Sequence, residues 1–301
     1  MRVTTNSNDS QMLAQIQQLT SLQTRLQTQV STGQRIFQPE DDPAAMGRVL
    51  TLETEKNQIS QFASNTSYAL DLSQASFSGL NEIKKISDRA GELATSGAGS
   101  LDPAALKTNA TEVNQLIEQG LQLANSQLRN NYLFAGTAVD QPPFKETRDP
   151  TTGDITSVSY VGNDTQASVQ ISATASITPG SSIDSNKALA DFLNHLVQLR
   201  DALNTGVSTN VSAVQPSLVT DENNLVSGLS EYGAVQLRIE INQSLQQDRL
   251  GDVGKLISTE TDVDLPTTVT KLNQASVAYQ AALQSTTKIM GMSLLDYLPA
   301  T

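Results

Sequence analysis

The sequence contains no cysteine and no tryptophan, and aromatic residues make up only 4% of its 301 residues. The absence of cysteine excludes disulfides and thiolate chemistry, and it is compatible with a chain that is exported unfolded. So few aromatic rings argue against a thick globular core. We therefore expect aliphatic side chains to be buried along narrow seams between long helices. The length allows one large domain or two to three smaller ones.

Positive charge is also scarce. The sequence has 19 Lys and Arg but 31 Asp and Glu, which gives a net charge of −12. An acidic surface disfavours nucleic acid and anionic membranes as partners. The N-terminal segment has no apolar region of the kind found in cleavable secretory signals. The sequence has no run of 18 apolar residues, so no membrane-spanning helix is predicted. If the protein leaves the cell, we expect it to do so by another route.

Proline is absent from residues 44–102, 217–265 and 267–298. Because proline removes a backbone donor and clashes with the preceding turn, long stretches without it favour long helices. We predict terminal helices over about 9–32 and 266–296 and one long helix over 44–96. Further helices are predicted over 103–130, 186–204 and 217–258.

Apolar residues in the two terminal helices recur at alternating spacings of three and four, which is typical of a coiled-coil seam. The candidate assembly seam consists of Leu19, Leu22, Leu26, Val30, Leu265, Val269, Leu272, Tyr279, Leu283 and Met290. Residues 1–38 and 266–301 carry only seven charged side chains, about half the density of the remainder. An isolated pair of such helices is marginally stable. We therefore predict that both ends pack against other subunits and are poorly ordered in the isolated chain.

A joint is predicted between the N-terminal helix and the long helix that follows it. Gly33 is expected to end the first helix in a left-handed conformation, and Pro39 prevents that helix from continuing. Asp42 is expected to cap the next helix, with Pro43 as its first residue. Glu40 and Asp41 favour the positive end of the same helix dipole.

Residues 139–184 lack the heptad spacing, and in two short runs within them apolar and polar residues alternate instead. Residues 156–160 and 167–171 flank Gly162-Asn163-Asp164, so we predict a hairpin between them. Asp149-Pro150 and Gly153 mark another turn.

The predicted fold is mainly α, an elongated antiparallel helical bundle or coiled coil built from nested N- and C-terminal arms, with a small β-rich inserted domain. Three domains are expected. They are a terminal coiled-coil assembly domain of residues 1–38 and 265–301, a central helical rod domain of residues 39–138 and 185–264, and a β-rich outer domain of residues 139–184.

No constellation of side chains predicts catalysis, a cofactor or a metal. His195 is the only histidine, and without cysteine or a second histidine we expect a structural role for it. Consecutive acids at residues 40–42 point in different directions, which favours capping over calcium binding. The acidic residues between 248 and 264 are interpreted as a solvated helix end and turn. Nucleotide-binding loops are absent.

Four stretches resemble the flagellin superfamily. They are VSTGQRIFQPEDDPA (30–44), NNYLFAGTAVDQPPF (130–144), YVGND (160–164) and TETDVDLPTTVTKLNQASVAYQAALQSTTKIMGMSLLDYL (259–298). Gln34 stands where the family usually has Lys, and Glu40 where it usually has a small residue. Pro39, Pro43 and the GMSLLDYL ending are more similar to the members that join hook and filament than to filament flagellins.

The resemblance implies a structural, non-enzymatic subunit of the bacterial flagellum at the junction between hook and filament. It implies export through the flagellar type III apparatus and assembly at the distal end of the hook, with no cofactor. The implied partners are other copies of the chain, the adjacent flagellar junction protein, flagellin, and a cytoplasmic export chaperone at the C-terminal helix. Two alternatives are a flagellin-type filament subunit and a non-flagellar secreted coiled-coil binding protein.

Overall fold

The computed structural model describes residues 2–100, 102–163, 165–180 and 182–295, with the side chains of residues 2–9, 183 and 289–295 outside the description. The chain forms two compact units, residues 1–57 with 250–301 (unit 1) and residues 58–249 (unit 2). The three-domain division made from the sequence stays a prediction.

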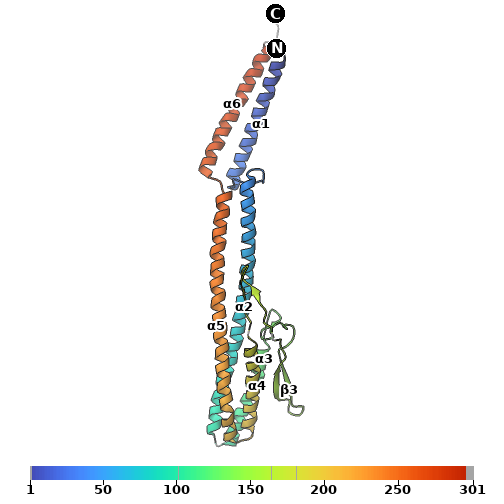
Figure 1. Cartoon of the computed structure of the whole chain (residues 1–301), viewed down its shortest axis with the longest axis vertical. Helices are drawn as coiled ribbons and strands as arrows, with labels where there is room; N and C mark the ends of the chain where they lie inside the picture. Colours follow the sequence, from blue (N-terminus) through green and yellow to red (C-terminus); the bar gives the residue numbers. More distant parts are fainter. Residues whose placement is uncertain (1, 101, 164, 181, 296–301) are drawn as a thin grey trace. The chain divides into compact units, whose positions relative to one another are not determined.

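Unit 1 contains α1 (Arg2–Thr32), the start of α2 (Pro43–Gly99), the end of α5 (Ser208–Thr261) and α6 (Leu265–Leu295). The helices α1 and α6 lie side by side and run antiparallel (Figure 1). The predicted ends of both terminal helices match within one residue at Thr32, Leu265 and Leu295, whereas α1 begins several residues before the predicted start. The nested pairing of the two chain ends is therefore present within one molecule.

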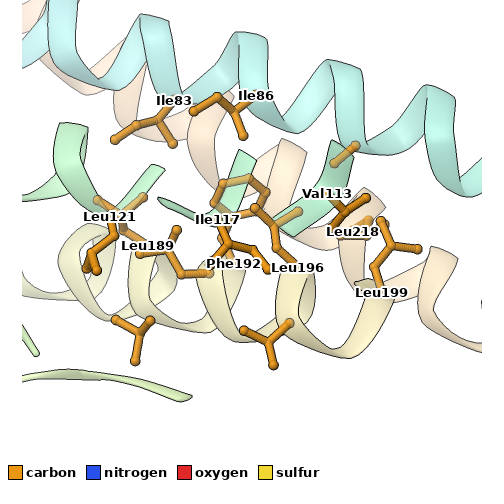
Figure 2. Packing of buried hydrophobic residues seen from close by; sticks show 14 of the residues in the cluster. Ile83, Ile86, Val113, Ile117, Leu121, Leu189, Phe192, Leu196, Leu199 and Leu218 are labelled. Carbon is orange, nitrogen blue, oxygen red and sulfur yellow. The ribbon is translucent and has the colours of Figure 1, made fainter. Parts of the chain in front are cut away.

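Unit 2 contains the rest of α2, α3 (Pro103–Ala124), α4 (Ile183–Asn204) and α5 up to residue 249. Its core lies where these four helices meet (Figure 2), and α3 packs extensively on α4. The buried side chains drawn there come from all four helices and include Ile83, Ile86, Val113, Ile117, Leu121, Leu189, Phe192, Leu196, Leu199 and Leu218. The core is aliphatic with few rings, as the composition predicts.

Among the described residues, three short antiparallel strand pairs follow α3 in the chain. They are β1 (Gln127–Leu128) with β2 (Asn131–Tyr132), β3 (Phe144–Arg148) with β4 (Ile155–Tyr160), and β5 (Val169–Gln170) with β6 (Ser176–Ile177). The predicted mainly α fold with a small β-rich part is confirmed. The helix predicted to run to residue 130 ends at Ala124. Arg129 and Asn130 have positive φ angles of 51° and 71° and lie in the turn between β1 and β2.

The predicted hairpin between residues 156–160 and 167–171 is wrong. The first of these segments is β4, but its partner is β3. The turn that joins them is the one around Asp149, whose Oδ1 accepts hydrogen bonds from the amides of Thr151 and Thr152, while Gly153 has a φ of +78°. Hydrogen bonds between a side chain and the backbone stabilise this turn locally. Asp164 of the predicted turn lies outside the described residues.

Side-chain amides hold the β3–β4 hairpin on the helices of unit 2. Asn194 of α4 donates to the carbonyl of Val158 and accepts from its amide, both at 2.8 Å. The side chain of Asn125 forms the same pair of bonds with Phe144. These amides take the place of a neighbouring strand, so the backbone groups that they pair are satisfied without a larger sheet.

The helix predicted to begin at residue 217 begins at Ser208 and contains Pro216. A proline removes one helical hydrogen bond but does not always end a helix. Here Val211 and Leu218, on either side of it, are both buried against the core of unit 2. Tertiary packing therefore carries the helix through the proline. Among the described residues, no helix is long and apolar enough to cross a membrane.

Candidate functional site

The joint between α1 and α2 is built as its residue types predict. Gly33 follows α1 with a φ of +72°, and its amide donates to the carbonyl of Gln29. Pro39 lies exposed in the loop, and Pro43 is the first residue of α2. The carboxylate of Asp42 accepts a hydrogen bond from the amide of Ala45 at 3.0 Å, which caps the helix.

The joint also contacts the segment between α5 and α6, which the sequence reading did not anticipate. The amide of Arg35 donates to the carbonyl of Thr261 at 2.6 Å, and the amide of Val263 donates to the carbonyl of Gly33 at 2.9 Å. These two bonds form a short antiparallel bridge between Gln34 and Asp262. The entry into α2 and the exit from α5 are therefore fastened together.

Arginine–carboxylate pairs surround this bridge. The guanidinium of Arg35 donates to Asp42 at 3.2 Å and to the carbonyl of Glu260 at 2.8 Å. Arg48 forms a bidentate salt bridge with the Glu260 carboxylate. Arg25 forms a salt bridge with Asp41 at 3.1 Å. A planar guanidinium matches a carboxylate in this way and fixes its direction as well as its charge.

Three carboxyl groups of the joint, those of Asp41, Asp42 and Glu260, have lowered pKa values. Backbone amides of Phe37 and Gln38 donate to Asp41 and lower its pKa. The amide of Ala45 lowers the pKa of Asp42, with Arg35 adding to the effect. Hydrogen bonds from Arg48 lower the pKa of Glu260. The acids of the joint thus act as helix caps and ion-pair partners. Glu40 lies exposed beside them.

The predicted seam residues of the terminal helices divide into two sets. Those that face the partner helix within the chain are buried or partly buried, namely Leu19, Leu26, Val30, Leu272 and Tyr279. Thr268 and Ala275 of α6 are buried on the same side, although they were not among the predicted seam residues. The side chain of Met290 lies outside the described residues.

The second set is exposed and large. Leu22 of α1 is 45% exposed, and Leu265, Val269 and Leu283 of α6 are 46%, 41% and 39% exposed. Separations of four and 14 residues place the three α6 side chains on one side of the helix, which we call the outer flank of α6. Packing of α1 on α6 therefore leaves about half of the predicted seam uncovered.

His195 of α4 pairs with a carboxylate of α5. Its Nδ1 lies 2.7 Å from Oδ2 of Asp221, whose side chain is only 2% exposed. Burial raises the pKa of Asp221, and the contact with His195 opposes this rise. Within the described part of the chain, no three His, Cys, Asp or Glu side chains are grouped so that they could hold a metal ion. The pair joins two core helices, which is a structural role.

Long paired terminal helices, a capped joint and a small β-rich part define a mainly α fold that resembles the fold of solved flagellar hook-associated proteins. Residues 3–139 match the family described as the bacterial flagellin N-terminal helical region. The chain is 27% identical to flagellar hook-associated protein 3 of Salmonella typhimurium over 319 residues, covering 98% of this chain and 99% of the relative. Flagellar hook-associated protein 3 of Escherichia coli is also 27% identical, over 89% of this chain and 90% of the relative.

Solved structures show the same fold. A protein of Vibrio parahaemolyticus described as flagellar hook-associated matches with a TM-score of 0.65 and 18% identity, over 74% of this chain and 100% of that one. Bacillus cereus FlgL matches with a TM-score of 0.59 and 14% identity, over 69% and 99%. The resemblance to the flagellin superfamily, and within it to the members at the hook–filament junction, is confirmed.

Proposed function

We propose that this chain is a structural subunit of the bacterial flagellum that forms the junction between hook and filament. Similarity over nearly the whole chain to flagellar hook-associated protein 3 supports this role. The relatives are structural flagellar proteins, which supports assembly rather than catalysis as the role of this chain.

The observation that carries the assembly mechanism is the exposed outer flank of α6 together with Leu22 of α1. Burying a large aliphatic side chain completely is worth about 1.5–3 kcal/mol, so the area still exposed on each contributes on the order of 1 kcal/mol when a neighbour covers it. Copies of the chain packed side by side would cover these residues. The terminal helices then complete their seams only in the assembled state.

The finer assignments follow from this role. The terminal helices form the assembly domain, the central helices support it, and the β-rich segment faces outward. The chain passes unfolded through the flagellar type III apparatus, for which the absence of cysteine is favourable, and joins the distal end of the hook. Its partners are other copies of itself, the adjacent flagellar junction protein, flagellin, and a cytoplasmic chaperone that binds the C-terminal helix before export.

Electron microscopy of bacteria in which this gene is deleted tests the proposal. We expect hooks without filaments, together with flagellin shed into the medium. Normal filaments on the deleted strain would overturn the junction role.

A filament subunit is the second candidate, because a flagellar filament core protein of Borreliella burgdorferi is 32% identical over 39% of this chain. That alternative predicts a different outcome in the same experiment. Filaments would then be missing because no subunit protein is made, and the medium would contain no flagellin.

A further inference from the structure

An apolar groove lies beside the joint in unit 1, between the first turns of α2 and the last turns of α5. Its volume is about 570 Å³. Its lining residues are Ala44, Gly47, Arg48, Thr51 and Leu52 of α2 and Leu256, Thr259 and Glu260 of α5. Leu256 is 51% exposed, so the groove has an uncovered aliphatic wall. On the α2 side, Ala44 and Gly47 leave part of the opposite wall without a large side chain.

The polar atoms around the groove are already satisfied. The hydroxyl of Thr51 donates to the carbonyl of Gly47, and that of Thr259 donates to the carbonyl of Lys255. Arg48 and Glu260 neutralise each other across the same pair of helices. The polar groups of the groove are thus already hydrogen-bonded or paired, and its remaining surface consists of methyl groups and leucine side chains. An apolar side chain can bind there without leaving a polar group unsatisfied.

Space is available on the α2 side. A Cβ atom added at Gly47 would meet nothing within 4 Å. The glycine is therefore not required by packing inside the chain. A larger side chain at this position would fill the groove without disturbing the helices that form it.

We propose that this groove receives the outer flank of α6 from a second copy of the chain. The charges are complementary. Residues 33–57 and 250–264, which surround the groove, contain nine Asp and Glu but only four Lys and Arg. By contrast, residues 265–288 of α6 contain Lys271 and Lys288 and no acid. The chain as a whole has a net charge of −12, but this segment of α6 is positively charged. The acidic residues around the groove therefore attract it.

This inference rests on the proposed assembly role and adds the surface that receives the exposed flank. Leu265, Val269 and Leu283 provide uncharged aliphatic side chains, and the groove provides an uncharged aliphatic wall beside acidic residues. Contact between copies would thus join the terminal helix of one to the base of the joint in the next.

Filling the groove is the first test. Gly47→Leu should leave the melting temperature unchanged or raised, and it should lower the fraction of hooks that carry filaments, with copies binding about tenfold more weakly. The matched control is Gly251→Leu. Gly251 is also helical, exposed and free of neighbours around an added Cβ, but it does not line the groove.

Cross-linking is the second test. The chain has no native cysteine, so only the introduced cysteines of its copies can form a disulfide between them. Two differently tagged copies, one with Thr51→Cys and one with Val269→Cys, are produced together, and isolated hook–filament particles are oxidised. A disulfide needs Cα atoms within about 7 Å, so a mixed dimer reports direct docking. Leu237→Cys, on an exposed position of α5 in unit 2, replaces Thr51→Cys as the control.

Normal filaments with Gly47→Leu, together with no Thr51–Val269 cross-link, would overturn the groove proposal. The assembly role would stand in that case if Leu283→Asp still blocked filament formation. Normal filaments with both variants would overturn the groove proposal and the assembly role together.

Discussion

The guanidinium of Arg48 donates two hydrogen bonds to the carboxylate of Glu260, at 2.8 and 2.9 Å, although the two residues lie in helices far apart in the sequence. This contact raises the pKa of Arg48 and lowers that of Glu260. Together with the backbone bridge between Gln34 and Asp262, it fastens the start of α2 to the end of α5. The joint that carries the terminal helices is therefore held by both halves of the chain.

Acid should loosen this joint. The pKa values of Asp41 and Asp42 lie below their usual 3.8, and that of Glu260 lies below its usual 4.5. A carboxyl with a lowered folded-state pKa stabilises the fold above its unfolded-state pKa, and this contribution is lost as the pH falls through the folded-state value. Amide NMR shifts of Phe37, Gln38 and Ala45 should stay constant above about pH 4.5 and change below about pH 3.8.

The control for this titration is Asp41→Asn. It should remove the acid transition at Phe37 and Gln38, whose amides donate to Asp41, and keep the transition at Ala45, which donates to Asp42. A transition centred well above pH 4.5 would contradict the assigned contacts.

Two glycines of unit 1 should respond to alanine in opposite directions. Gly33 has a φ of +72°, so Gly33→Ala should lower the free energy of unfolding by about 1 kcal/mol through backbone strain. Gly47 is in a helix with open space around it, so Gly47→Ala should raise that free energy by about 0.5–1 kcal/mol. Urea denaturation measures both. Equal effects of the same sign would show that the joint does not need the left-handed conformation.

The buried carboxyl of Asp221 should make unit 2 less stable as the pH rises. Its pKa is raised by burial, so its contribution is fully present below about pH 3.8 and is lost as the pH rises through the higher folded-state value. Asp221→Asn should flatten the pH dependence of the unfolding free energy as the pH rises above about 3.8. The same slope in both proteins would show that the contact with His195 fully offsets the burial.

The core of unit 2 should be sensitive to cavities. Phe192 is completely buried among aliphatic side chains of four helices (Figure 2), so Phe192→Ala should cost about 3–5 kcal/mol of unfolding free energy. Val161 is 49% exposed, and Val161→Ala should change stability by less than about 0.5 kcal/mol. Chemical denaturation compares the two, and similar losses would place Phe192 outside a close-packed core.

The sequence predicted the features that depend on local chemistry. The stretch without proline after Pro43 is a helix from Pro43 to Gly99, and Gly33 and Asp42 have the conformation and the bond expected of helix caps. The predictions from the sequence were wrong where contacts between distant segments determine the local structure. Pro216 does not end α5 because packing on both sides holds the helix, and β4 pairs with β3 across a turn stabilised by Asp149.

The contacts of the joint were also missed. Nothing in the local sequence around Arg48 or Glu260 indicates that they meet, because their meeting depends on the antiparallel course of α2 and α5. Likewise, the heptad spacing of α6 found the apolar residues but could not separate those that face α1 from those on the outer flank.

The most direct measurement compares Leu283→Asp with Ala275→Asp by counting filament-bearing hooks and recording the melting temperature of each purified protein. Leu283 is on the exposed outer flank, whereas Ala275 is buried against α1. We predict that Leu283→Asp abolishes filaments and leaves the melting temperature nearly unchanged, while Ala275→Asp lowers both. Normal filaments with Leu283→Asp, or a loss of melting temperature as large as that of Ala275→Asp, would contradict assembly through the outer flank.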